Sequence, residues 1–301
     1  MIFSSSGGKM KPRLQNIKRR ELLQMLAGAS ILPLFPLSAC AEKKGLEAGF
    51  ESPGETTDSS DEHSIDDTGD LLESGIDERT GWAIGGTANM PDKASYPDPF
   101  TMTAGECLLL APTTLGPCIV DEEFDREDIS EGWNGVPLRL GLRIMDESCT
   151  PISGAKIKIW HTGYSGSYSG DTPRNDICLL KPEFASQHFF RGHQITDSAG
   201  IVFFDTCFPG WYPGRVIHIH IEIIINNTST YASQLFFPED VVQEICGHHS
   251  IYQPFGVPNV QFQTDGVLDD ISIETIERHI LEIEKMTDGA MLASKSITIM
   301  T

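Results

Sequence analysis

Two histidines, His218 and His220, stand two residues apart in a segment where apolar and polar residues alternate. Residues 216–225 read Val-Ile-His-Ile-His-Ile-Glu-Ile-Ile-Ile, which is the pattern of a β-strand with one apolar face. Side chains at positions i and i+2 of a strand leave the same face, with Cα atoms about 6–7 Å apart. The spacing therefore allows both imidazoles to bind one metal ion, although it also fits two exposed histidines. Glu222 lies on the same face and leaves open a two-histidine, one-carboxylate site for iron(II) or zinc.

Further motifs flank the histidine strand on both sides. Residues 209–215 (Pro-Gly-Trp-Tyr-Pro-Gly-Arg) precede it, and residues 233–238 (Ser-Gln-Leu-Phe-Phe-Pro) follow it. Upstream stand residues 154–161 (Gly-Ala-Lys-Ile-Lys-Ile-Trp-His), 166–170 (Gly-Ser-Tyr-Ser-Gly) and 191–200 (Arg-Gly-His-Gln-Ile-Thr-Asp-Ser-Ala-Gly). In this order, the motifs resemble the intradiol ring-cleavage dioxygenases, the family of protocatechuate 3,4-dioxygenase and catechol 1,2-dioxygenase, and particularly its short exported members. Several motifs in one order are far more specific than a single His-x-His.

The resemblance implies a non-haem iron(III) site in which two tyrosinates and two histidines hold Fe(3+). The matching positions in this sequence are Tyr168, Tyr212, His218 and His220. Tyr164 is a competing tyrosine four residues before Tyr168. A tyrosine hydroxyl has an unperturbed pKa of about 10, and a bound cation can deprotonate it. Phenolate is a hard anionic donor, so this ligand set favours iron(III) over iron(II).

The same resemblance implies catalytic roles for Arg215, Gln234 and Tyr212. Arg215 would support the substrate and offset negative charge that develops on it, and Gln234 would line the pocket. The implied reaction opens a catechol-type ring between its two hydroxyls with O2 and gives a cis,cis-muconate-type diacid. The implied partners are a small aromatic diol and O2.

The sequence departs from the family pattern at the first strand of the pocket. Family members often carry Glu-Gly-Pro-Tyr there, whereas residues 115–118 read Leu-Gly-Pro-Cys. Cys118 replaces an aromatic residue that can shape the substrate pocket, so the identity of the catechol cannot be carried over. An alternative function is a non-catalytic surface binder of catechols or catecholate iron chelates.

The elements around these motifs indicate an all-β fold. Short β-branched runs separated by Gly, Pro, Asp and Asn predict an antiparallel β-sandwich with long active-site loops over residues 97–301. The expected strands lie at residues 136–145, 155–160, 200–205, 216–225 and 234–237. Residues 276–286 fit either a helix or the first arm of a hairpin that turns at 287–289, and the hairpin is favoured because residues 296–300 fit a closing strand.

The amino-terminal part of the sequence predicts an export signal and a tether. Residues 1–40 combine Arg19-Arg20, an apolar stretch and Leu-Ser-Ala before Cys40, which indicates a twin-arginine lipoprotein signal peptide. The acidic, Ser/Thr/Gly-rich residues 41–96 are expected to form a disordered linker. The chain is therefore expected to be exported and lipid-anchored to a bacterial cell envelope through Cys40.

Charge and cysteine content add two limits. The formal net charge of −21 argues against nucleic acid and against electrostatic attachment to anionic lipid, which leaves the lipid on Cys40 as the membrane contact. Six cysteines remain after Cys40, and an oxidising compartment favours at least one disulfide among them. Their pairing cannot be read from the sequence, because six cysteines allow 15 combinations. They are Cys107, Cys118, Cys149, Cys178, Cys207 and Cys246.

Overall fold

A computed structural model describes residues 75–101, 107–173 and 177–301. The expected signal peptide, Cys40 and residues 41–74 of the expected linker lie outside the described residues. None of the helices in the described ranges combines the length and apolar composition that crossing a bilayer requires.

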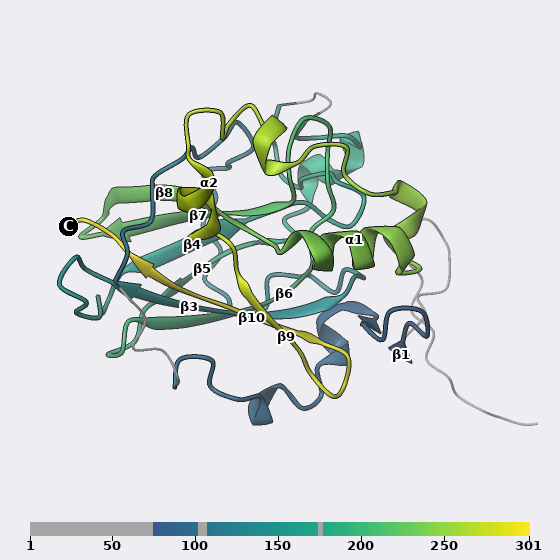
Figure 1. Ribbon diagram of the computed structural model, residues 1–301, viewed down its shortest axis with the longest axis horizontal. Coiled ribbons are helices and arrows are strands. Elements are labelled where there is room, and N and C mark those ends of the chain that lie inside the picture. Colours follow the sequence, from purple (N-terminus) through teal and green to yellow (C-terminus); the bar gives the residue numbers. More distant parts are fainter. Residues whose placement is uncertain (1–74, 102–106, 174–176) are drawn as a thin grey trace, which may run out of the picture. The chain divides into compact units, whose positions relative to one another are not determined.

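The described part of the chain is mostly β-sheet with few helices (Figure 1). One four-stranded sheet has the order β6-β3-β10-β9, and a second has the order β5-β4-β7-β8. A two-stranded sheet pairs β1 with β2. The strands are β1 (Gly75–Ile76), β2 (Ala83–Ile84), β3 (Pro137–Met145), β4 (Lys156–Trp160), β5 (Arg191–Ile195), β6 (Ile201–Cys207), β7 (His218–Ile225), β8 (Thr228–Phe236), β9 (Glu282–Lys285) and β10 (Met291–Thr298).

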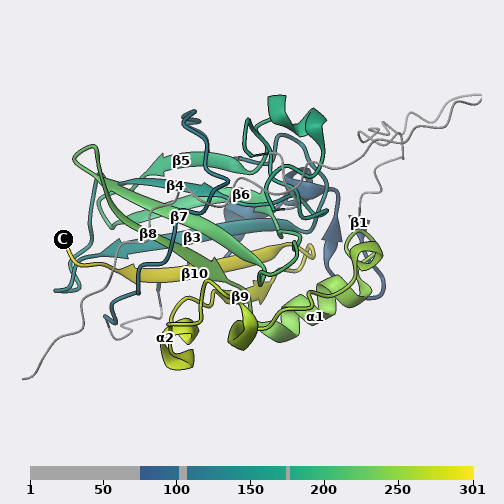
Figure 2. The ribbon, with the colours of Figure 1, turned by 90° about the horizontal axis from the view of Figure 1, so that it is seen from above.

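The helices are short and lie outside the two four-stranded sheets (Figures 1 and 2). The α-helices are α1 (Glu239–His248) and α2 (Ile273–Glu277), and the 3-10 helices are Gly86–Asn89, Lys93–Ser95, Pro182–Ser186, Gln253–Phe255 and Phe262–Thr264. All five expected strands are present. The expectation of wholly antiparallel sheets is wrong, because β10 pairs with β3 in parallel.

Both four-stranded sheets contribute one face to a common apolar cluster. On β7, Ile219, Ile221 and Ile223 point into this cluster and are fully buried. Leu140 on β3 and Ile159 on β4 belong to the same cluster. The alternation of β7 therefore turns its histidines to the opposite face of the sheet, away from the core.

Two hairpins show how local sequence sets the strand connections. Asn226 and Asn227 join β7 to β8 with φ angles of 52° and 59°, a left-handed conformation that asparagine tolerates well. The favoured hairpin near the C-terminal end is confirmed, because β9 pairs antiparallel with β10 across residues 286–290. A helix over residues 276–286 does not form, although α2 ends at Glu277.

The expected linker does not extend through residues 75–96. Trp82 is 2% exposed and belongs to the apolar core, and its indole N–H donates to Glu244 of α1 at 3.0 Å. Asp77 accepts the backbone N–H of Ser250 at 2.8 Å. Residues 41–96 are acidic on average but contain a short apolar run, Trp82-Ala83-Ile84. Burial of this run fixes residues 75–96 to the domain.

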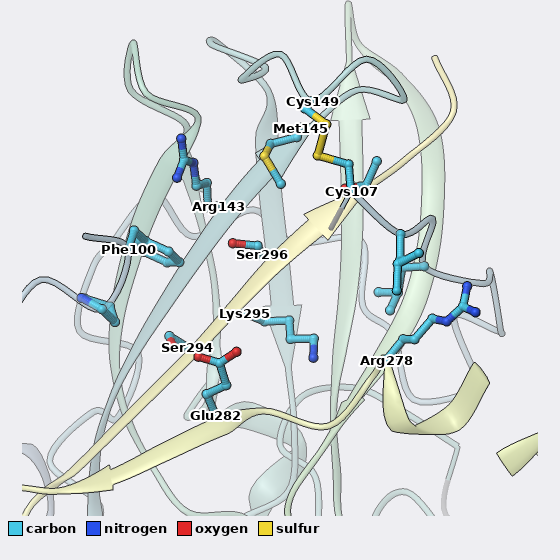
Figure 3. Close-up of a pocket in the computed structure, with 14 residues that line it drawn as sticks. Phe100, Cys107, Arg143, Met145, Cys149, Arg278, Glu282, Ser294, Lys295 and Ser296 are labelled. Atoms are coloured by element: carbon cyan, nitrogen blue, oxygen red, sulfur yellow. A yellow bond between two sulfur atoms is a disulfide. The ribbon is translucent and has the colours of Figure 1, made fainter. Parts of the chain in front are cut away.

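Four cysteines of the described part form two disulfides, Cys107–Cys149 and Cys118–Cys178. This confirms the expectation of at least one disulfide. Cys207 and Cys246 carry buried thiols. The first disulfide lines a cavity of about 410 Å³ on the sheet that contains β3 and β10, together with Arg143, Lys295 and Arg278 (Figure 3).

Candidate metal centre

The candidate centre lies on the face of the β5-β4-β7-β8 sheet that points away from the core. His218 and His220 stand on that face of β7, and Gln234 on β8 pairs in register with His220. Loops cover the face: Thr113 donates its N–H to Ala232 of β8, and Val120 accepts a hydrogen bond from Lys158 of β4 at 2.8 Å. The histidines are therefore buried although they lie outside the core.

The structure brings the four expected ligands to one point. The hydroxyl oxygens of Tyr168 and Tyr212 lie 3.4 Å and 3.2 Å from Nε2 of His218. Nε2 of His220 also lies 3.2 Å from Nε2 of His218. Nδ1 of His218 donates to the carbonyl oxygen of Val216 at 2.7 Å, which directs the lone pair of Nε2 toward the other three donors.

In the protein without iron, burial keeps these four side chains neutral. It raises the pKa of Tyr168 well above its usual range, and it raises the pKa of Tyr212 against the opposing effect of Arg215. Burial likewise lowers the pKa of His218 far below its usual range and that of His220 to about 3. Two imidazole lone pairs and two phenolic oxygens thus converge without a charge of their own, and this donor set fits a ferric ion.

Neither alternative ligand joins the cluster. Across the described ranges, no three histidine, cysteine, aspartate or glutamate side chains gather as a metal site requires, so Glu222 does not complete a site with the two histidines. The ring of Tyr164 lies against Trp133 and Phe255, with centroids 6.0 Å and 5.9 Å away. Of Tyr164 and Tyr168, the tyrosine whose hydroxyl lies beside His218 is Tyr168.

The ring of His220 is held by residues from two other segments. Trp160 of β4 stacks on it, with ring centroids 4.9 Å apart and planes 3° apart. Gly116 approaches it so closely that an added Cβ would lie 3.0 Å from Cε1 of His220. Gly116 belongs to the Leu-Gly-Pro-Cys segment that departs from the family pattern, so this segment packs directly on one of the expected ligands.

Arg215 connects Tyr212, Gln234 and Asp265. Its Nη1 lies 3.5 Å from the hydroxyl of Tyr212, and its Nη2 donates to Oε1 of Gln234. Its Nε donates to both carboxylate oxygens of Asp265 at 2.9 Å and 3.0 Å. Nε2 of Gln234 is buried and has no hydrogen-bond partner among the described residues, so this amide can donate to a substrate.

Sequence reasoning missed Asp265. This fully buried carboxylate also accepts the N–H of Val216 at 3.0 Å, so it fixes both the side chain of Arg215 and the backbone next to it. A partner 50 residues away along the chain leaves no local pattern, and Asp265 lies beyond the segment in which the motifs resemble a family.

Similarity to known proteins identifies the family of this chain. A family model described as "Dioxygenase" matches residues 120–252. The solved structure of an intradiol ring-cleavage dioxygenase from Tetranychus urticae is 30% identical, with a TM-score of 0.57, over 64% of this chain and 95% of that one. A second solved dioxygenase is 32% identical with the same TM-score of 0.57 and also matches over 95% of its length. The chain belongs to the intradiol ring-cleavage dioxygenase family.

A curated member of this family, chlorocatechol 1,2-dioxygenase from Rhodococcus opacus, is 27% identical over 161 residues. The alignment covers 47% of this chain and 54% of that protein, so the chain spans about half the length of this relative. The matched family region contains every expected ligand together with Arg215 and Gln234, whereas Cys118 and Asp265 lie outside it.

Proposed function

We propose that this member of the intradiol family is a non-haem iron(III) dioxygenase. It would cleave a catechol-type ring between its two hydroxyls with O2 and give a cis,cis-muconate-type diacid. The observation that carries the proposal is the convergence of two tyrosine hydroxyls and one imidazole nitrogen within 3.2–3.4 Å of Nε2 of His218.

Tyr168, Tyr212, His218 and His220 would hold Fe(3+). When bound, this ion would supply the charge that ionises a chelated catechol and prepares its ring for oxygen. All four side chains are at most 5% exposed, so the protein keeps bulk water away from the reacting ring.

Arg215 and Gln234 would act on the substrate rather than on the metal. The guanidinium of Arg215 lies beside the Tyr212 hydroxyl, so it can stabilise negative charge on that oxygen or on a substrate oxygen that takes its place. The side-chain oxygen of Gln234 accepts a hydrogen bond from Arg215, so its Nε2 group can donate a hydrogen bond to the substrate. Asp265 restricts the direction in which Arg215 can point.

The test is visible absorption and oxygen uptake of the purified full chain with a panel of catechols under air. A tyrosinate–iron(III) charge-transfer band that one catechol perturbs, together with oxygen uptake, is the expected result. Tyr212→Phe should weaken the band and the uptake, and Tyr164→Phe is the matched control, because its ring lies against Trp133 and Phe255. A band that shifts without oxygen uptake would instead indicate a catechol binder. Bound iron without any band would refute the two-tyrosine ligand set.

We also propose that the two four-stranded sheets form the layers of a β-sandwich. The proposal is supported by the large apolar cluster to which both sheets contribute.

Export and lipid anchoring are a further part of the proposal. The twin-arginine pattern and the cysteine that follows Leu-Ser-Ala support it, and so do two disulfides, which persist in oxidising compartments. Incorporation of labelled fatty acid in a bacterial host would test it. Labelling of the unaltered chain and its loss in Cys40→Ala are expected, whereas equal labelling of both would contradict an anchor at Cys40.

A further inference from the structure

Cys118, the residue at which this chain departs from the family pattern, is bonded to Cys178, 60 residues away along the chain. Both half-cystines are buried and pack in one apolar cluster with Trp160, Tyr168 and Tyr212. The disulfide therefore belongs to the apolar cluster that also contains both tyrosines of the candidate metal centre.

Each end of this disulfide is joined to a different expected ligand. On the Cys178 side, the carbonyl oxygen of Cys178 accepts the N–H of Tyr168 at 2.8 Å, and Leu180 donates its N–H to Ser167 at 3.1 Å. On the Cys118 side, Gly116 lies against the ring of His220. The covalent bond thus links the backbone that supports Tyr168 to the segment that confines His220.

The buried Arg191 makes a second connection between the same two segments. Its Nη2 donates to the carbonyl oxygen of Cys118 at 2.8 Å and to that of Ser169 at 2.6 Å. Its guanidinium also lies 5.8 Å from the ring centre of Tyr168. Two independent links, one covalent and one made by hydrogen bonds of the Arg191 guanidinium, therefore hold the loop of Tyr168 to the segment of Gly116.

We propose that Cys118 and Cys178 are positioning residues whose disulfide holds Tyr168 and His220 at the spacing that one ferric ion requires. Tyr168 comes from a loop and His220 from a strand, so without a link the loop can move relative to the sheet. A metal site loses affinity when its supporting contacts are loosened, by about 10- to 100-fold in measured cases. The inference rests on the proposed function, because it concerns the same centre.

The other disulfide supplies a matched control. Cys107–Cys149 closes a chain segment of similar length, 42 residues, but lines the separate cavity on the β3–β10 sheet (Figure 3). None of the four expected ligands lines that cavity. The pairs C118A/C178A and C107A/C149A therefore remove equivalent cross-links, and only the first acts on the centre.

The test compares the iron-loaded full chain with both double variants by release of iron to an external chelator and by the tyrosinate–iron(III) band. We expect C118A/C178A to release iron about 10- to 100-fold faster and to show a weakened or shifted band, whereas C107A/C149A should behave as the unaltered chain does. Equal release rates and bands in both variants would overturn the proposal.

A second measurement needs no metal and separates this inference from the proposed function. In the iron-free protein, the amide of Tyr168 should exchange its hydrogen faster in C118A/C178A than in C107A/C149A, because its acceptor is the carbonyl of Cys178. Equal exchange would overturn the positioning role even if the unaltered chain is an active dioxygenase. Conversely, an unaltered chain without the band would refute the proposed function while this exchange difference could still be measured.

If C118A/C178A does not fold, C107A/C149A itself provides the comparison. This variant can be produced in an oxidising and in a reducing compartment, so that Cys118–Cys178 is formed in one sample and open in the other. Faster iron release and faster Tyr168 exchange in the open form are expected, and identical behaviour of the two forms would contradict the proposal.

Discussion

The indole of Trp160 stacks on the imidazole of His220, with centroids 4.9 Å apart and planes 3° apart. The two residues lie opposite each other on the paired strands β4 and β7, so the register of the sheet itself creates the stack. A ring held in this way can turn little about its side-chain bonds, and its nitrogen keeps its direction toward the other three donors.

Trp160→Phe should weaken iron binding about tenfold or more, because a smaller ring covers less of the imidazole and lets it rotate. Chelator-driven iron release measures the effect. Trp82→Phe is the matched control, since Trp82 is also buried but belongs to the amino-terminal segment and packs in the apolar core. Similar iron release from both variants would mean that the stack does not position the ligand.

Gly116→Ala should disturb the centre more than its backbone conformation alone explains. Gly116 has a φ of 68°, and an added Cβ would lie 3.0 Å from His220. Gly132→Ala is the control, because Gly132 has a φ of 75° with no atom within 4 Å of an added Cβ. Both variants should lose about 1–2 kcal/mol of stability from the left-handed backbone. Only Gly116→Ala should alter the charge-transfer band, and an unchanged band would contradict contact-controlled positioning.

Asp265→Asn should lower kcat/KM about 10- to 100-fold while iron and the tyrosinate band remain, because Arg215 loses the carboxylate that directs it. The unfolding free energy should fall by about 3–5 kcal/mol, since a buried ion pair loses one charge. Glu274→Gln, which breaks the exposed pair with Arg278, should cost less than about 1 kcal/mol. Steady-state kinetics and urea unfolding test both parts, and full activity in Asp265→Asn would refute the role.

Stability should fall on acidification partly because of His161. Burial lowers the pKa of this histidine to about 4, and the neutral ring bonds Thr162 and Thr206. The unfolded chain takes up a proton near pH 6.5 whereas the folded one does not until about pH 4, so folding weakens between these values. The contribution between pH 7 and pH 5 is about 2 kcal/mol. Urea unfolding at both pH values should show a smaller loss in His161→Gln, and an equal loss in both proteins would contradict this assignment.

The sequence predicts most of the centre because its signals are local. The alternation in residues 216–225 places His218 and His220 on one face, and short motifs mark Tyr168 and Tyr212. The structure confirms that these side chains meet, although their role as iron ligands stays a prediction. The contacts that support the centre join residues far apart in the sequence. Asp265 forms an ion pair with Arg215, 50 residues away, and Cys118 forms a disulfide with Cys178, 60 residues away.

The predicted boundary between the linker and the domain, at residues 96–97, is wrong for a different physical reason. Average composition over residues 41–96 is acidic and polar, but three consecutive residues, Trp82 to Ile84, are enough to bury their segment. The parallel pairing of β10 with β3 was missed because a strand pattern shows which face is apolar but not which neighbour, or which direction, the strand will take.

The place of β10 also orders the events of synthesis. This strand, Met291–Thr298, lies between β3 and β9 inside its sheet, so β3 has only β6 as a partner until translation has passed residue 298. Leu138, Leu140 and Leu142 of β3 share an apolar cluster with Ala293 and Ile297 of β10. This part of the cluster is therefore incomplete until β10 has been synthesised. A nascent chain therefore carries its histidine strand before the β6-β3-β10-β9 sheet can form, and this sheet is complete only once β10 has been synthesised.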